Sequence, residues 1–107
     1  MLFRSENIFE SIPANLDQEV FELLVKSENV KIERIISKGH TSPETGWHDQ
    51  EKNEWVIVLK GEAIISFEHG KKLNLKAGDY INIPANTKHK VTWTNQISET
   101  IWIAIHY

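Results

Sequence analysis

Two segments, one that ends in a glycine and one that begins with a glycine, constrain the fold of this chain more than any other feature. The first, Glu54–Gly61, has an apolar strand pattern that begins with a carboxylate and ends in a glycine turn. The second, Gly78–His89, holds a short strand closed by Pro84 and then an imidazole. A small β-barrel could bring Glu54 and His89 to one place. The two segments therefore predict where a site lies, although they do not indicate its substrate.

From residue 20 onward, glycine or polar turns divide the chain at strand-length intervals, and Val, Ile, Trp and Phe dominate the runs between them. The predicted strands are 21–26, 30–37, 54–60, 62–68, 71–76, 79–83, 89–94 and 100–106. Helix is an alternative for 17–26, because Asp17 could cap one. We favour a strand there, since its apolar residues can continue into a hairpin. Regular short strands of this kind predict an all-β sandwich or barrel.

Composition limits the classes of function. A chain of 107 residues with 40% hydrophobic side chains suits one domain, with 1–19 as an N-terminal arm and 20–107 as the barrel. Fifteen acidic residues against 12 basic ones, without a basic stripe, argue against a nucleic-acid partner.

The lack of cysteine excludes disulfides, zinc-thiolate sites and cysteine nucleophiles. Without a signal-peptide pattern or an apolar run near ~18 residues, we expect a cytoplasmic protein with no membrane segment.

One long irregular stretch, residues 38–53, interrupts the strands. Structureless segments of this length inside a compact domain are usually functional. This stretch contains Trp47, His48 and Gln50, directly before Glu54. The sequence therefore predicts that the loop contributes side chains to the site.

On these residues the chain resembles a single-domain cupin, a small double-stranded β-helix barrel, over roughly residues 30–107. The first cupin motif is G-x5-H-x-H-x3-4-E-x6-G, and His48, Glu54 and Gly61 match it, with Gln50 in place of the second histidine. The second motif is G-x5-P-x-G-x2-H-x3-N. Its matching residues here are Gly78, Pro84 and His89, while Asn86 replaces a glycine and Trp93 replaces the final asparagine.

The resemblance implies a metal site made of His48, Gln50, Glu54 and His89, beside a pocket for a small organic molecule. Such mixed nitrogen and oxygen donors suit Fe(II), Mn(II), Ni(II), Zn(II) or Cu(II). One hypothesis is then a metal-dependent dioxygenase or isomerase. The alternative is a non-catalytic small-molecule-binding or scaffold protein without metal, in which the histidines and Glu54 form a polar cluster that binds a ligand or moves a proton.

Further pocket residues follow from strand alternation. Trp93 shares parity with His89, so we expect it to point inward, and Trp47 borders the pocket mouth. Tyr80 and His106 are weaker candidates for the lining. Alternation also predicts an outward row of apolar residues, Trp55, Ile57 and Leu59, which would need cover. A homodimer is the natural way to cover it.

Overall fold

The computed structural model describes residues 3–107, and within this range the chain forms eight strands and no helix. The strands are β1 (Val20–Lys26), β2 (Lys31–Ser37), β3 (Glu54–Lys60), β4 (Glu62–Phe67), β5 (Lys72–Lys76), β6 (Tyr80–Ile83), β7 (His89–Thr94) and β8 (Thr100–His106). The all-β prediction is confirmed, and the segment that could have been a helix is β1. No helix in the described range has the length and apolarity to cross a membrane.

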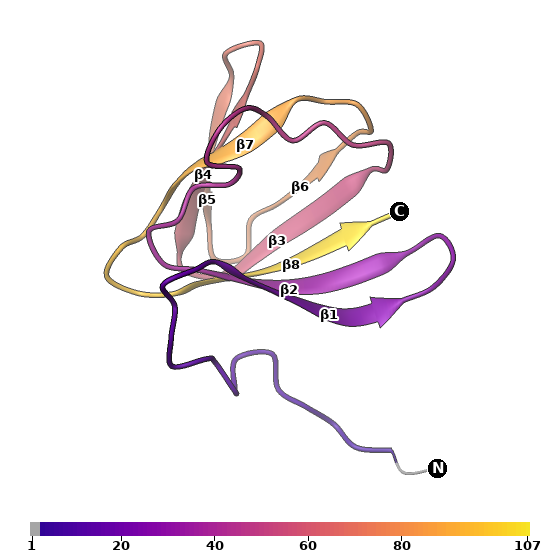
Figure 1. Cartoon of the computed structure of the whole chain (residues 1–107), viewed down its shortest axis with the longest axis vertical. Helices are drawn as coiled ribbons and strands as arrows, with labels where there is room; N and C mark the ends of the chain where they lie inside the picture. Colours follow the sequence, from indigo (N-terminus) through magenta and orange to yellow (C-terminus); the bar gives the residue numbers. More distant parts are fainter. Residues whose placement is uncertain (1–2) are drawn as a thin grey trace.

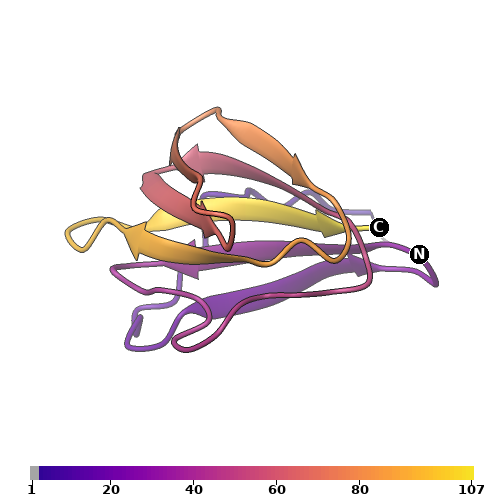
Figure 2. The ribbon, with the colours of Figure 1, turned by 90° about the horizontal axis from the view of Figure 1, so that it is seen from above.

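The strands form two antiparallel sheets that face each other (Figures 1 and 2). The larger sheet has the order β1-β2-β8-β3-β6, and the smaller one has the order β5-β4-β7. The smaller sheet has two strands fewer, and the β1–β2 hairpin lies at one edge of the larger sheet. Strands far apart in sequence are therefore neighbours, as when β8 lies between β2 and β3.

The hydrophobic core lies between the two sheets, and strand alternation decides which residues enter it. On β3, Val56 and Val58 are buried at 4% and 0% exposure, and on β8 Trp102 and Ala104 are buried beside them. Trp55 and Ile57 alternate with these residues and therefore point to the other side of the sheet. The buried indole of Trp102 donates a hydrogen bond to Ser37 Oγ at 3.3 Å.

Two positions with positive φ explain the motif residues found there. Gly61 turns β3 into β4 with φ of 90°, and a Cβ at this position would lie 2.7 Å from the Cα of Thr100. Only glycine satisfies both the conformation and this close approach. Asn86 has φ of 61° at the place where the cupin motif has a glycine. Asparagine is among the residues that enter the left-handed region most readily, so the substitution keeps the turn.

The segments outside the strands run along the barrel. Residues 38–53 contain no strand, but they contact β7 through two isolated bridges, Ser42 with Val91 and His48 with His89. The predicted arm, residues 1–19, begins with residues 1–2, which lie outside the described range. Its described part forms no strand and crosses the outer side of the larger sheet, where the guanidinium of Arg34 donates to the carbonyl of Ser11 at 3.2 Å.

Candidate functional site

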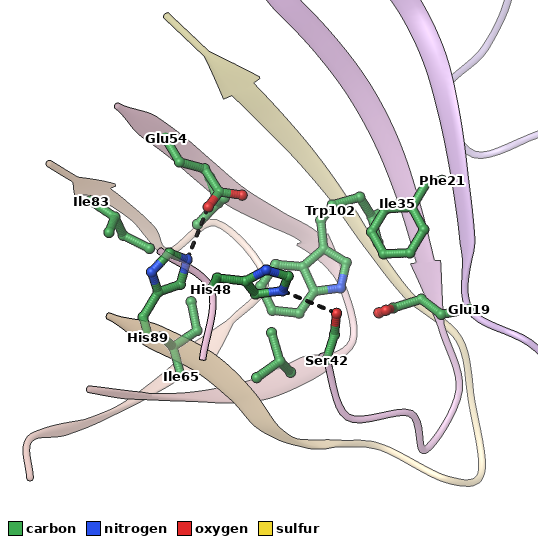
Figure 3. Close-up of a pocket in the computed structure, with 12 residues that line it drawn as sticks. Glu19, Phe21, Ile35, Ser42, His48, Glu54, Ile65, Ile83, His89 and Trp102 are labelled. Atoms are coloured by element: carbon green, nitrogen blue, oxygen red, sulfur yellow. Dashed lines mark hydrogen bonds and ion pairs between the residues drawn. The ribbon is translucent and has the colours of Figure 1, made fainter. Parts of the chain in front are cut away.

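A cavity of about 50 Å³ lies between the sheets, with Glu54, His89 and His48 gathered on one side of it and Glu19 on the opposite side (Figure 3). Its walls are mostly apolar, formed by Phe21, Ile35, Val56, Ile65, Ile83, Val91 and Trp102. Its polar groups are Glu19, Ser42, His48, Glu54 and His89. A predominantly apolar cavity with a few convergent polar groups is the usual form of a small-molecule site.

The central contact among the polar groups is between Glu54 and His89, the two residues that the sequence predicts to lie together. Glu54 begins β3 and points inward with Val56, and His89 begins β7 on the facing sheet. The imidazole Nε2 of His89 lies 3.1 Å from Oε1 of Glu54, and the side chains are only 5% and 13% exposed. The other ring nitrogen of His89, Nδ1, donates to the carbonyl of Thr87 at 2.7 Å. This bond orients the ring and directs Nε2 toward the carboxylate.

The surroundings of this pair favour its charged form. Burial alone raises the pKa of Glu54, but the hydrogen bond from His89 and the charges of His106 and His89 outweigh it, so the pKa lies below its ordinary value. Burial lowers the pKa of His89, but the hydrogen bond to Glu54 and then the bond to Thr87 outweigh it, so that pKa is raised. The two residues therefore stabilise each other as an ion pair inside a poorly solvated cavity.

Two further side chains, Gln50 and His106, approach the carboxylate of Glu54 from the side that faces away from the cavity. Gln50 donates its amide to Glu54 Oε1 at 2.9 Å. His106 Nε2 lies 3.9 Å from Glu54 Oε2 and 3.2 Å from Oε1 of Glu33. Gln50 and His106 line a separate surface groove near the β1–β2 hairpin rather than the cavity itself. Glu54 thus stands between the cavity and this groove.

His48 lies beside His89 but is turned toward a different partner. Its ring centroid is 5.5 Å from that of His89, and its Nε2 lies 3.2 Å from Oγ of Ser42. Burial, followed by the positive charge of His89, lowers the pKa of His48. The site therefore combines an imidazole whose neutral form is favoured, His48, with a pair whose charged form is favoured.

Three of the four predicted metal ligands, His48, Glu54 and His89, line the cavity, and Gln50 contacts Glu54 from the groove side, but the four do not form a coordination site as arranged. Among residues 3–107 no three His, Asp or Glu side chains converge in a way that could hold an ion. Only Nε2 of His89 and Oε1 of Glu54 converge, while His48 bonds Ser42 and Gln50 presents its N–H₂ to Glu54 rather than its carbonyl. An amide N–H is not a metal ligand, so the present donor set does not fit a metal without rotation of His48 and Gln50.

All four predicted pocket residues, Trp47, Tyr80, Trp93 and His106, lie outside the cavity lining. Trp93 is 38% exposed and outside the cavity lining, because the pairing of β4 with β7 shifts register between Ile64 and Ile65. Thr92 becomes an extra residue, and this bulge inverts the parity that predicted an inward Trp93. Tyr80 is 65% exposed and packs on Trp55, with ring centroids 5.4 Å apart. Trp47 also lies outside the lining, under the ammonium of Lys90.

Several residues of the site were not foreseen. Ser42 is a polar residue of the long loop, and the prediction that this loop contributes to the site was the only signal for it. The Thr87 contact uses a backbone carbonyl, which carries no sequence signal. Glu19 directly precedes β1 and Phe21 lies in it; Phe21 pairs with Ile35, which also lines the cavity, so both side chains lie on the same face of the sheet.

Comparison with known proteins agrees with this arrangement. Residues 33–106 match the family model described as Cupin domain. The chain belongs to the cupin family. A protein from Ralstonia eutropha JMP134, called a "putative mannose-6-phosphate isomerase", is 36% identical, with 96% of each chain covered and a TM-score of 0.90.

More distant cupin structures share the fold. An RmlC-like cupin from Desulfovibrio desulfuricans is 23% identical, covering 98% of this chain and 97% of its own, with a TM-score of 0.75. An RmlC-like protein from Methanocaldococcus jannaschii, described with a double-stranded β-helix fold, is 21% identical, covering 99% and 91%, with a TM-score of 0.72. The double-stranded β-helix prediction is thereby confirmed. None of the curated proteins matches this chain.

Proposed function

We propose that this cupin binds a small, largely uncharged organic molecule in its cavity, with one polar group of the ligand at the Glu54–His89 pair. The observation that carries this proposal is a buried carboxylate–imidazole contact of 3.1 Å at one side of a cavity whose walls are mostly apolar. A ligand hydroxyl or carbonyl could share these hydrogen bonds, and the apolar walls would hold the remainder.

The same pair is suited to moving a proton at the bound molecule. The lowered pKa of Glu54 favours its role as an acceptor, and the hydrogen bond to the carboxylate, which raises the pKa of His89, favours the imidazole as a donor. Side chains of these types, with shifted pKa values and within hydrogen-bond reach, are typical of general acid–base sites. Proton transfer in an isomerisation is thus the reaction class that the residues support.

A sugar phosphate fits this cavity poorly, although the relative from Ralstonia eutropha is named for one. Within the described chain no lysine or arginine lines the cavity, and its carboxylates are Glu19 and Glu54. A phosphate dianion there would lose its hydration without gaining a charged donor other than His89. We therefore expect neutral ligands to bind in preference to mannose 6-phosphate.

Two tryptophans allow this proposal to be tested by NMR on ¹⁵N-labelled protein. The indole of Trp102 lines the cavity, whereas that of Trp93 lies outside it, which makes Trp93 an internal control. The probes are small ketones, alcohols, hydroxy acids and mannose 6-phosphate. Binding of a neutral probe should shift the Trp102 indole N–H, leave Trp93 unchanged, and weaken at least tenfold in the His89→Gln variant.

Two outcomes of that experiment would overturn the proposal. One is that no neutral probe moves the Trp102 signal, and the other is that mannose 6-phosphate is the tightest ligand. A shift that persists in the His89→Gln variant would place the ligand elsewhere in the cavity. Titration of His89 ring signals with the bound probe would then show whether the pair exchanges a proton with it.

A divalent metal is the second candidate, favoured by one observation. His48, Glu54 and His89 line the same cavity and Gln50 bonds Glu54 from the groove side, so these four residues would hold a divalent ion if His48 and Gln50 rotated toward Glu54 and His89. Elemental analysis of the wild type beside His89→Ala tests it. Stoichiometric metal that is lost in the variant supports a metal site. No metal after anaerobic addition of Fe(II), Mn(II), Ni(II) or Zn(II) removes this candidate.

A further inference from the structure

A second carboxylate, that of Glu19, lies in the cavity opposite the contact between Glu54 and His89 (Figure 3). Glu19 directly precedes β1, at the end of the N-terminal arm, and its side chain is half-buried. Binding of one polar ligand group at Glu54 and His89 gives this carboxylate no role. Its role depends on which of its hydrogen-bonding positions the protein itself fills.

Two buried side chains hold one oxygen of this carboxylate. Ser37, which is 0% exposed, donates its hydroxyl to Oε2 of Glu19. The indole N–H of Trp102 in turn donates to Ser37 Oγ at 3.3 Å. Because an indole N–H can only donate, the hydroxyl of Ser37 accepts from it and keeps its own hydrogen for Glu19. A chain of two donors therefore fixes the orientation of the carboxylate.

The backbone beside Glu19 is also held in place. His40 accepts the backbone N–H of Lys38 at Nδ1, at a distance of 2.9 Å. Its Nε2 therefore carries the ring hydrogen and donates to the carbonyl of Asp17 at 3.1 Å. Val20, the residue after Glu19, begins β1. Glu19 thus lies between a hydrogen-bonded anchor and a strand, so its side chain is positioned before any ligand binds.

The hydrogen bonds at Glu19 leave room for a donor from the ligand. Within residues 3–107, the bond from Ser37 is the one that the carboxylate of Glu19 accepts. A carboxylate offers acceptor positions on both oxygens and has no hydrogen to donate when ionised. A ligand that displaces water from the second oxygen must supply a hydrogen bond itself, because a desolvated carboxylate oxygen without a donor is costly.

We propose that Glu19 is a specificity-determining residue, which selects ligands that carry a hydroxyl opposite the group bound at Glu54 and His89. This inference rests on the proposed function and adds the second polar group of the ligand. A hydroxyl suits the site better than an ammonium group, because a charged group loses far more hydration in a mostly apolar cavity.

The size of the cavity limits the length of this ligand. Its volume of about 50 Å³ is far below the roughly 300–1,000 Å³ of sites that hold drug-sized molecules. A molecule with only a few carbon atoms would therefore contact Glu19 on one side and Glu54 with His89 on the other. The ligand class is a short hydroxyketone or diol.

Matched pairs of ketones, with and without a hydroxyl, test the role of Glu19. The pairs are acetone with hydroxyacetone, and butanone with the hydroxybutanone whose hydroxyl is at the far end of the chain. The Trp102 indole N–H of ¹⁵N-labelled protein reports the dissociation constants. In the wild type at least one hydroxyketone should bind about tenfold more tightly than its parent ketone, because its hydroxyl donates to a charged group.

Two variants of Glu19 separate recognition from stability. Glu19→Leu removes the acceptor and keeps an apolar side chain of similar size, so the preference for the hydroxyl should fall about tenfold. Damage to packing alone would weaken both members of a pair equally. Glu19→Asp withdraws the carboxylate by one carbon, so the preference should persist and shift toward the longer hydroxyketone. This conservative variant gives a result even if Glu19→Leu does not fold.

A distant carboxylate provides the matched control. Glu68 has a side chain that is 55% exposed, lies 3.6 Å from Lys88 and does not line the cavity. Glu68→Gln removes one negative charge from the protein, as Glu19→Leu does. Its preference for the hydroxyketones should equal that of the wild type. A loss in this variant would show that net charge, and not contact with Glu19, sets the preference.

The outcomes distinguish a failure of this inference from a failure of the proposed function. If neither ketones nor hydroxyketones shift the Trp102 signal, the proposed function fails and the role of Glu19 fails with it. If the two members of each pair bind equally, or the preference survives Glu19→Leu, ligand binding stands and the role of Glu19 is overturned. Unchanged length selectivity in Glu19→Asp contradicts direct contact. Tighter binding of ethanolamine than of either hydroxyketone contradicts the hydroxyl class.

Discussion

Two histidine–glutamate contacts lie on either side of the carboxylate of Glu54, and their geometry is nearly the same. His89 Nε2 is 3.1 Å from Glu54 Oε1, and His106 Nε2 is 3.2 Å from Glu33 Oε1. The first contact faces the cavity between the sheets, whereas the second belongs to the rim of a surface groove. The contact distance alone therefore does not show which histidine belongs to the binding site and which one only supports it.

The difference lies in what else holds each imidazole. His89 is 5% exposed and its second nitrogen is bonded to the Thr87 carbonyl, so both of its ring nitrogens are engaged. His106 is 12% exposed and reaches Glu54 only at 3.9 Å. We infer that His89 is the preorganised partner of Glu54 and that His106 adjusts the field around the carboxylate. The following predictions test this ranking, from the largest expected effect to the smallest.

The largest effect is expected from removing each histidine. His89→Ala leaves a buried carboxylate without its charged partner, which should reduce the free energy of unfolding by about 3 kcal/mol. His106→Ala removes one hydrogen bond at a more open position and should cost about 1 kcal/mol. Urea denaturation of both variants measures the difference. Equal losses would show that the two contacts are equivalent.

The pair should also give stability a defined pH dependence. The raised pKa of His89 means that its contribution is full below its ordinary value of 6.5 and is lost as pH rises through its folded pKa. The lowered pKa of Glu54 means that its contribution is present above 4.5 and is lost as pH falls through its folded pKa. The pair should therefore contribute most between pH 4.5 and 6.5.

His48 must be separated from this effect, because its lowered pKa makes it reduce stability as pH falls below 6.5. The comparison is therefore between the wild type and His89→Gln, both of which retain His48. The stability difference between them, measured by urea denaturation at several pH values, should shrink above pH 6.5. A difference that grows as pH rises above that value would contradict the assigned direction.

A smaller effect is expected at Gln50, which bonds Glu54 Oε1 from the groove side. Gln50→Leu removes one donor to a charged group and should cost about 1.5 kcal/mol, together with a rise in the pKa of Glu54. Gln50→Glu is the sharper control, since a second carboxylate should destabilise at neutral pH and recover in acid. NMR titration of the Glu54 carboxyl carbon measures both variants. An unchanged pKa in Gln50→Leu would remove this residue from the cluster.

The smallest effect is expected at Lys31, which contacts Glu33, the partner of His106. Lys31 Nζ is 3.7 Å from Glu33 Oε1, and its side chain is 43% exposed. Lys31→Ala should change the free energy of unfolding by no more than about 0.5 kcal/mol, because exposed ion pairs are weak. A larger loss, seen in the same urea experiment, would mean that the groove side is more tightly coupled to Glu54 than its exposure indicates.

Much of the fold follows from local patterns in the sequence. Each predicted strand lies within one residue of the observed strand, because apolar alternation and glycine turns act over short distances. The turn predicted from the glycine after the 54–60 strand pattern is present at Gly61, between β3 and β4. The pairing of Glu54 with His89 followed from the motif resemblance, and the structure brings them together.

The alternation of side chains along a regular strand could not predict the direction of Trp93 on β7. His89 and Trp93 are four residues apart, and a regular strand would point both inward, but the extra residue Thr92 reverses the direction after Val91. The bulge is produced by pairing with β4, where Thr92 Oγ1 meets Ser66 Oγ at 2.8 Å. No property of residues 89–94 taken alone indicates it.

The sequence by itself determined the strands, the all-β class, the position of the long loop and the residue types that meet at the site. These depend on side-chain periodicity and backbone preference, which are local. Only the tertiary structure decided that His48 bonds Ser42, that a backbone carbonyl orients His89, and that Trp93 lies outside. Each of these results from contacts between segments far apart in the chain, whose register and rotamers are fixed only when the two sheets and the loop pack together.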